Sequence, residues 1–127
     1  MSIVPIKPQR TDVLCIDNDN AMLDAIRKML AIETVDVLVA NDLDDGLAMV
    51  IKHIPKVIIL GRIMTGQDER SALPALSNFA PFSSVIVLSG YPGVTYNSDS
   101  SQPEPPRSTV SGEELLRNVH RLLRLAA

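Results

Sequence analysis

The chain has 127 residues, 46% of them apolar, and a formal net charge of -3. A chain of this length buries the core of one domain without covalent staples, so we expect a single domain over residues 1–127. The weak negative charge excludes a general binder of nucleic acid or of membrane surfaces, which needs a concentrated basic face, and no apolar run reaches the ~18 residues of a membrane span.

The first half of the chain alternates between short apolar runs and helical patterns. Residues 1–11 contain two prolines and predict an extended lead-in. Residues 13–16 predict a buried strand, and the polar residues 17–20 after it predict a helix cap. The apolar face of this helix recurs at 3.6-residue spacing, at Met22, Leu23, Ile26, Met29 and Leu30. The only cysteine, Cys15, lies in the first run, which predicts a buried thiol and favours a reducing cytoplasm.

The middle of the chain continues this alternation. Valines at positions 35, 37 and 39 predict a strand, and residues 42–53 predict a second helix. The buried stripe expected for that helix is Leu47, Val50, Ile51 and Ile54. Residues 57–60 form an unbroken apolar run, which is typical of a central parallel strand buried on both faces.

In the second half of the chain, one long segment interrupts the alternation of strands and helices. Residues 71–79 predict a short helix with Pro74 in its first turn, and residues 85–88 predict a buried strand. Residues 90–111 carry four prolines and no apolar periodicity, so we expect a long irregular loop that ends in a vestigial edge strand at residues 108–110. A last helix follows, with Ser111 and Glu114 as a capping box and an apolar face made of Leu115, Leu116, Val119, Leu122 and Leu123.

The order of these elements predicts an α/β fold, with a three-layer, doubly wound parallel sheet. Ligands of such sheets bind at the carboxyl ends of the strands. The predicted central strand ends at Gly61, and glycine has no reactive side chain. The position best placed for chemistry therefore carries no chemical group.

Four segments of the chain resemble the receiver domain of two-component response regulators. They are the cluster Asp17-Asn18-Asp19 after the first strand, residues 55–68, the strand end at Ser89-Gly90, and residues 111–116 at the start of the last helix. The resemblance covers essentially the whole chain. It implies the flavodoxin-like receiver fold, with a degenerate fourth helix and fifth strand.

The resemblance also shows which receiver residues are missing. Gly61 stands at the position of the phospho-acceptor aspartate, so the nucleophile is absent. The magnesium ligands map to Asn18, Gly61 and the carbonyl of Ile63, so we expect no specific magnesium site and no other cofactor. Asp17 and Asp19 leave weak metal binding open.

Two further receiver positions complete this comparison. Ser89 matches the switch hydroxyl, while Ser108 or Arg107 falls where receivers carry a lysine. The altered positions together imply an atypical receiver, or pseudo-receiver, that is not an enzyme.

The expected function is a cytoplasmic signalling module that acts through protein contacts without aspartyl phosphorylation. Its partner would be a kinase, an output domain or another regulator, or a second copy bound through the last helix and the 90–111 loop. The alternatives are a phosphorelay receiver with an unorthodox acceptor and a sensor of a small ligand in the vacated acidic pocket. An unrelated flavodoxin-like or nucleotide-binding enzyme lacks support because the sequence has no phosphate-cradling loop.

Two arginine features have competing interpretations. Arg62 either pairs with the Asp17 and Asp19 cluster or is a solvated loop residue. Arg117, Arg121 and Arg124 recur at helical spacing, and this stripe is either a solvated face or a docking surface for an acidic protein.

Overall fold

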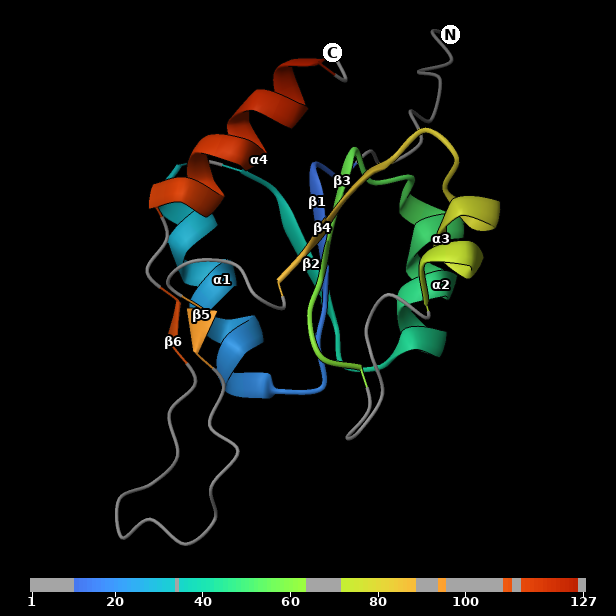
Figure 1. Ribbon diagram of the computed structural model, residues 1–127, viewed down its shortest axis with the longest axis horizontal. Coiled ribbons are helices and arrows are strands. Elements are labelled where there is room, and N and C mark those ends of the chain that lie inside the picture. The colour runs from blue at the N-terminus through green and yellow to red at the C-terminus, as the bar shows by residue number, and fades with distance from the viewer. Residues whose placement is uncertain are drawn as a thin grey trace, which may run out of the picture.

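The computed structural model describes residues 11–33, 35–63, 72–88, 94–95, 109–110 and 113–125. Four parallel strands form one sheet in the order β2-β1-β3-β4 (Figure 1). They are β1 Val13–Ile16, β2 Val37–Ala40, β3 Val57–Leu60 and β4 Ser84–Val87. The predicted parallel α/β sheet is therefore confirmed, with the order reversal at β1 that defines a doubly wound sheet.

The strands pair without stagger, so their ends line up. Val13 of β1 lies opposite Val37 of β2 and Val57 of β3, and Val57 lies opposite Ser84 of β4. The carboxyl ends of all four strands consequently meet at one edge of the sheet, and their amino ends meet at the other.

Among the described residues, two helices cover each face of the sheet, as can be followed in Figure 1. Helices α1, Asn20–Ile32, and α4, Glu113–Leu125, lie on one face. Helices α2, Leu43–His53, and α3, Leu73–Phe79, lie on the other. Pro74 lies in the first turn of α3, as predicted, where its missing N–H costs no helical hydrogen bond.

The fully buried strands β1 and β3 supply both hydrophobic cores. Cys15 and Ile59 belong to the core under α1 and α4, whereas Ile16 and Leu60 belong to the core under α2 and α3. This division follows from the alternation of side chains along a strand. It explains why both apolar runs lack a polar residue, since each face of these strands packs against helices.

The residue that caps the end of helix α2 is an isoleucine in a conformation that L residues rarely adopt. Ile54 has φ 47° and ψ 66°, in the left-handed region, while its N–H still donates to the Val50 carbonyl at 3.1 Å. This conformation costs a residue with a Cβ about 1–2 kcal/mol, which glycine avoids.

The predicted buried stripe of α2 was wrong at two positions. Val50 is buried, but Ile51 and Ile54 are 62% and 55% exposed. Ile51 is rotated by about 100° around the helix from the buried Val50, which places it at the side of the helix, outside the buried face. Ile54 leaves the helix at its left-handed turn and so no longer follows the helical stripe.

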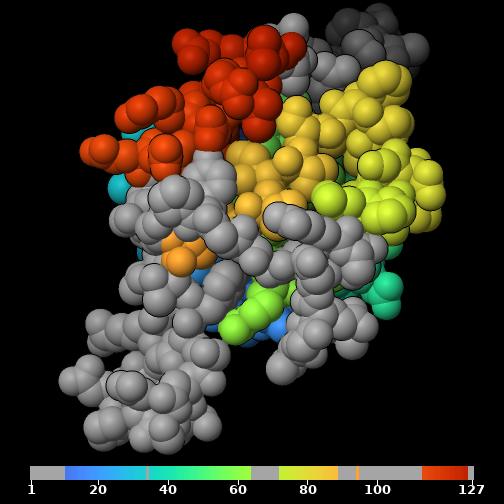
Figure 2. All heavy atoms as spheres, viewed as in Figure 1, coloured from blue at the N-terminus to red at the C-terminus, as the bar shows by residue number. Residues whose placement is uncertain are grey.

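The strand predicted at residues 108–110 does not join the parallel sheet. Strand β6, Thr109–Val110, pairs antiparallel with β5, Val94–Thr95, in a separate two-stranded sheet beside α1 (Figure 1). The predicted irregular loop 90–111 thus contains a strand pair, and its remaining residues, including the region of a fourth helix, lie outside the described residues. Within the described part of the chain β4 is an edge strand, and its atoms reach the surface between α4 and α3 (Figure 2).

Candidate functional site

The carboxyl ends of β1 and β3 bring the predicted acidic cluster next to Gly61 and Arg62. The Gly61 N–H donates to the carbonyl of Ile16 at 2.7 Å, and the Asn18 N–H donates to the carbonyl of Arg62 at 2.5 Å. These two backbone bonds continue the pairing of the strands past their ends. They hold residues 17–19 and 61–62 together as one polar site at the sheet edge.

Asp17 is the buried member of this cluster. It is fully buried, and its Oδ1 accepts the Asp19 N–H at 2.8 Å, which shapes the turn from β1 into α1. Burial, and secondly the nearby Asp17 carboxylate, raise the pKa of the Cys15 thiol. Cys15 is thus buried, as the sequence predicted, and its raised pKa favours the protonated thiol.

Asp19 uses its two carboxylate oxygens for different partners. Its Oδ1 accepts the N–H groups of Ala21 and Met22, at 2.9 and 3.2 Å, and so caps α1. Its Oδ2 lies 3.5 Å from Nη2 of Arg62. The same side chain therefore satisfies the start of a helix and binds a cation from the end of β3.

Arg62 forms the ion pair that the sequence offered as one of two interpretations. Its side chain is 30% exposed and that of Asp19 is 15% exposed, so both charges are partly shielded from water. An ion pair in this setting is screened less by solvent than one between fully exposed side chains. The guanidinium places a fixed positive charge at the rim of the acidic cluster.

The residues present do not fit the magnesium ion that receiver domains bind. Asn18 is exposed and carries an amide, and Gly61 has no side chain. Asp19 already binds two N–H groups and a guanidinium. Among the described residues, no three His, Cys, Asp or Glu side chains gather closely enough to hold a metal ion. Magnesium is usually held by one or two carboxylates and several waters in octahedral geometry. The second carboxylate of the cluster, Asp17, is fully buried, and its Oδ1 accepts the Asp19 N–H, so the cluster does not offer this geometry.

Several predicted site residues lie outside the described residues. They are the switch-position Ser89 and the lysine-position residues Arg107 and Ser108. The structure therefore shows the acidic cluster, Gly61 and Arg62 together, and leaves the other positions as predictions.

The basic stripe of α4 is exposed. Arg117, Arg121 and Arg124 all face solvent, while Leu115 and Val119 are buried as predicted. Beside the stripe, Nε2 of His120 lies 3.6 Å from Oε2 of Glu33, which links α4 to the end of α1. No helix in the described part of the chain is long and apolar enough to cross a membrane.

Sequence reasoning missed a concave apolar surface at the opposite edge of the sheet. It is lined in part by Phe79, Pro81 and Phe82. Two phenylalanines and a proline in the four residues 79–82, before a strand, were the available signal.

Comparison with solved structures identifies the fold. A receiver domain protein (CheY-like) from Methanospirillum hungatei JF-1 is 17% identical, with a TM-score of 0.68 over 92% of this chain and 96% of that chain. The receiver domain of a putative Luxo repressor protein from Vibrio parahaemolyticus is 16% identical, with a TM-score of 0.65 over 92% of each chain. A receiver domain from Clostridium thermocellum is 24% identical, with a TM-score of 0.54 over 61% of this chain and 63% of that chain.

Neither family models nor curated proteins match this sequence. At identities below 25%, the structural neighbours show the fold and not the chemistry of the site. The chain thus has the fold of response-regulator receiver domains.

Proposed function

We propose that this chain is a receiver-like signalling module that acts through protein contacts without aspartyl phosphorylation. The observation that carries the proposal is Gly61 at the end of β3, beside the acidic cluster, where the resemblance places the phospho-acceptor aspartate. Glycine offers no carboxylate to attack a phosphohistidine. The domain is then neither an enzyme nor dependent on magnesium.

The ion pair of Arg62 and Asp19 supports this proposal because it gives the site a positive charge that does not change. Receivers balance the negative charge of the phosphoryl group with a lysine and with a bound metal ion, which can dissociate. Here the guanidinium is part of the chain and remains charged at every physiological pH. A fixed charge suits a domain whose output is set by partner binding.

The exposed stripe of Arg117, Arg121 and Arg124 supports an acidic protein as the partner. In this proposal the partner is a cytoplasmic signalling protein, such as a kinase, an output domain or a regulator. The basic side chains would speed association and align the two proteins.

The proposal is tested by incubating the protein with acetyl phosphate and magnesium and measuring its intact mass. We expect no phosphate adduct. Titration with magnesium and beryllofluoride, a phosphoryl mimic, should likewise show no saturable binding. A stoichiometric adduct on the unmodified protein would overturn the proposal and favour an unorthodox acceptor residue.

A further inference from the structure

Strand β4 is an edge of the parallel sheet, and one side of it has no partner strand among the described residues. The predicted edge strand at residues 108–110 does not occupy this position, because β6 pairs with β5 in the separate sheet. Figure 2 shows atoms of β4 at the surface between α4 and α3. Ser84, Val85 and Val87 are only partly buried. In the part of the chain that the structure describes, β4 can therefore accept a further strand.

The backbone of β4 directs its polar groups alternately to its two sides. The Ser84 N–H donates to the carbonyl of Lys56 at 3.0 Å, so this residue faces β3. The Leu88 N–H, four residues later, also donates to β3, at 2.9 Å. Because neighbouring residues of a strand direct their backbone groups to opposite sides, Val85 and Val87 direct theirs away from β3. These two valines thus present their N–H and C=O groups to a strand that joins the edge.

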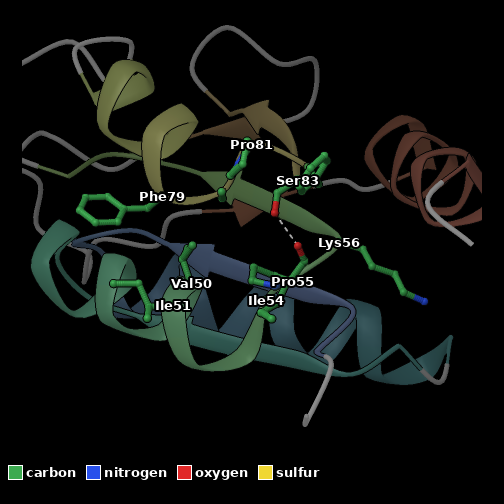
Figure 3. Close-up of a pocket in the computed structure, with 10 residues that line it drawn as sticks. Val50, Ile51, Ile54, Pro55, Lys56, Phe79, Pro81 and Ser83 are labelled. Atoms are coloured by element: carbon green, nitrogen blue, oxygen red, sulfur yellow. Dashed lines mark hydrogen bonds between the residues drawn. The ribbon is translucent and has the colours of Figure 1, made fainter. Parts of the chain in front are cut away.

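Hydrogen bonds to β3 fix β4 before any partner binds. At its amino end, the Ser83 hydroxyl donates to the Pro55 carbonyl at 2.5 Å, as Figure 3 shows. Together with the bonds of Ser84 and Leu88, this contact holds β4 in place at both ends. The edge is thus preformed, and a joining strand does not have to order it.

The β4 edge lacks the features with which proteins usually protect an open edge. Such edges commonly carry charged side chains or proline. Residues 79–88 contain no charged side chain, and residues 84–87 contain no proline. The other edge strand, β2, is flanked by Asp36 and Asp42, whose negative charges would repel the same edge of a second copy. Two copies of the chain can therefore approach through β4 without charge repulsion between their strands.

The β4 edge is also complementary to itself. Val85 and Val87 lie on either side of Ile86. An antiparallel second copy centred on Ile86 places Val85 opposite Val87 of that copy, and each such pair exchanges two N–H···O=C bonds. The two pairs together satisfy all outward backbone groups of both strands. Their β-branched side chains also lie directly opposite one another, which is a favourable cross-strand pair.

Helix α4 leaves room for this pairing. The two-fold axis of an antiparallel strand pair is perpendicular to the sheet, so the α4 helices of both copies lie on the same face. Each α4 contacts its own β3, and the two β3 strands would be three strand spacings, or about 14 Å, apart. This exceeds the roughly 8–10 Å between packed helices. Arg117, Arg121 and Arg124 lie on the side of α4 opposite the buried Val119, so they point away from the shared sheet.

We propose that the β4 edge binds the β4 edge of a second copy of this chain, in antiparallel orientation and centred on Ile86. The two four-stranded sheets then form one sheet of eight strands. This interface differs from a dimer through the last helix and the 90–111 loop, which the sequence predicts as one possibility. The inference goes beyond the proposed function, because it depends neither on phosphorylation nor on an acidic partner.

Sedimentation velocity over a series of protein concentrations tests the pairing. We expect a reversible dimer with a dissociation constant in the micromolar range, because one strand pair is a small interface. The dimer should not weaken when the salt concentration is raised, since the paired strands contain no charged residue. A dimer held by the arginines of α4 would weaken with salt, and this result would contradict the pairing.

Proline substitutions at matched positions separate pairing from folding. Val87→Pro removes an outward N–H group and leaves the bonds to β3, so it should weaken dimerisation about tenfold. Val39→Pro makes the same change at the other edge of the sheet and should leave the dimer unchanged. Position 39 matches because the Asp17 N–H donates to the Ala40 carbonyl at 3.0 Å, so Ala40 faces β1 and Val39 faces outward. Val87→Lys keeps the N–H group but adds a charge to the edge, and it should also weaken the dimer about tenfold if the proline variant does not fold.

Cysteine cross-linking tests the register of the two strands. In the proposed pairing, the Cα atoms of Val85 and of Val87 in the second copy are about 5.5 Å apart, within reach of a disulfide. Two copies of Val85 are not opposite one another. A mixture of Val85→Cys and Val87→Cys should therefore form a covalent dimer on oxidation much faster than either variant alone. Cys15 is buried and should not compete.

Three further outcomes would overturn the inference. One is a monomer at every concentration, and another is a dimer that survives both Val87→Pro and Val87→Lys. The third is cross-linking of one cysteine variant alone that is as fast as that of the mixture. None of these outcomes bears on the phosphorylation test, so the two proposals fail separately.

Discussion

Arg62 and Asp19, 43 positions apart in the sequence, form an ion pair with Nη2 and Oδ2 separated by 3.5 Å. The other carboxylate oxygen of Asp19 caps α1, so the pair connects the end of β3 to the start of that helix. The arginine follows the glycine at the acceptor position directly. A fixed cation thus stands directly beside the residue that the resemblance places at the acceptor position.

Arg62→Ala should lower the free energy of unfolding by about 1 kcal/mol, because it leaves a partly buried Asp19 without its cation. Urea denaturation measures this change. Arg27→Ala is the control, since Arg27 pairs with Asp24 at 3.1 Å but both side chains are largely exposed. We expect no measurable change in the control, and equal losses in both variants would contradict a special role for Arg62.

Substitutions of Asp19 should separate its capping role from its charge. Asp19→Ala removes the helix cap and should cost about 1–2 kcal/mol, whereas Asp19→Asn keeps an oxygen acceptor and should cost less. When Asp19→Asn is combined with Arg62→Ala, the double variant should be more stable than the sum of the two losses predicts, because both changes remove the same ion pair. Strict additivity in chemical denaturation would show that the pair contributes nothing.

Gly46→Ala should destabilise the fold, although alanine normally favours a helix. A Cβ at Gly46 would lie 2.5 Å from Cδ1 and 2.8 Å from Cγ1 of the fully buried Ile16. We expect a loss of about 1–3 kcal/mol from overpacking, measured by thermal denaturation. Adding Ile16→Val removes Cδ1 and should recover part of this loss, whereas a greater loss in the double variant would show that Gly46 is needed for another reason.

The stability of the protein should fall at alkaline pH because of Cys15. Burial and the neighbouring Asp17 raise the pKa of this thiol above its ordinary value of 9.0, so the unfolded chain releases the proton first. The stabilisation that comes from the protonated thiol is fully present below pH 9.0. Above pH 9.0 the free energy of unfolding should decrease by at most about 1.4 kcal/mol per pH unit. Cys15→Ala should show a smaller decrease between pH 8 and pH 10 in denaturation measurements, and equal slopes would contradict this assignment.

Gly61→Asp should not restore efficient phosphorylation. The substitution adds a nucleophile, but Asn18 still provides an amide in place of a carboxylate, and Asp19 remains bound to Arg62. Phosphoryl transfer depends on positive charge placed around the transferring group. Intact mass after incubation with acetyl phosphate and magnesium is the measurement, with Gly61→Ala as a control for folding. A stoichiometric adduct on Gly61→Asp would show that the remaining site supports transfer after all.

The sequence by itself determined the elements and the layers of this fold. Short apolar runs around Val13 and Val57 predicted strands buried on both faces, because only helices on both sides of a sheet remove every position from water. The polar cluster at residues 17–19 was correctly predicted to cap α1. A helix cap can be predicted because the aspartate and the N–H groups that it binds are close together in the sequence. Gly61 directly after the apolar run of β3 is likewise visible in the sequence alone.

The tertiary structure decided which residues meet. Local patterns could not choose between a solvated Arg62 and one paired with Asp19, because that contact depends on β3 lying beside β1. Periodicity assigned Ile51 and Ile54 to the core, whereas Ile51 lies outside the buried face of α2 and Ile54 leaves the helix at its left-handed turn. Both line the concave apolar surface together with Phe82. The structure also shows that strand β6 pairs with β5. The sequence could not show this pairing, because strand partners are set by long-range geometry and a strand of two residues carries no pattern that identifies its partner.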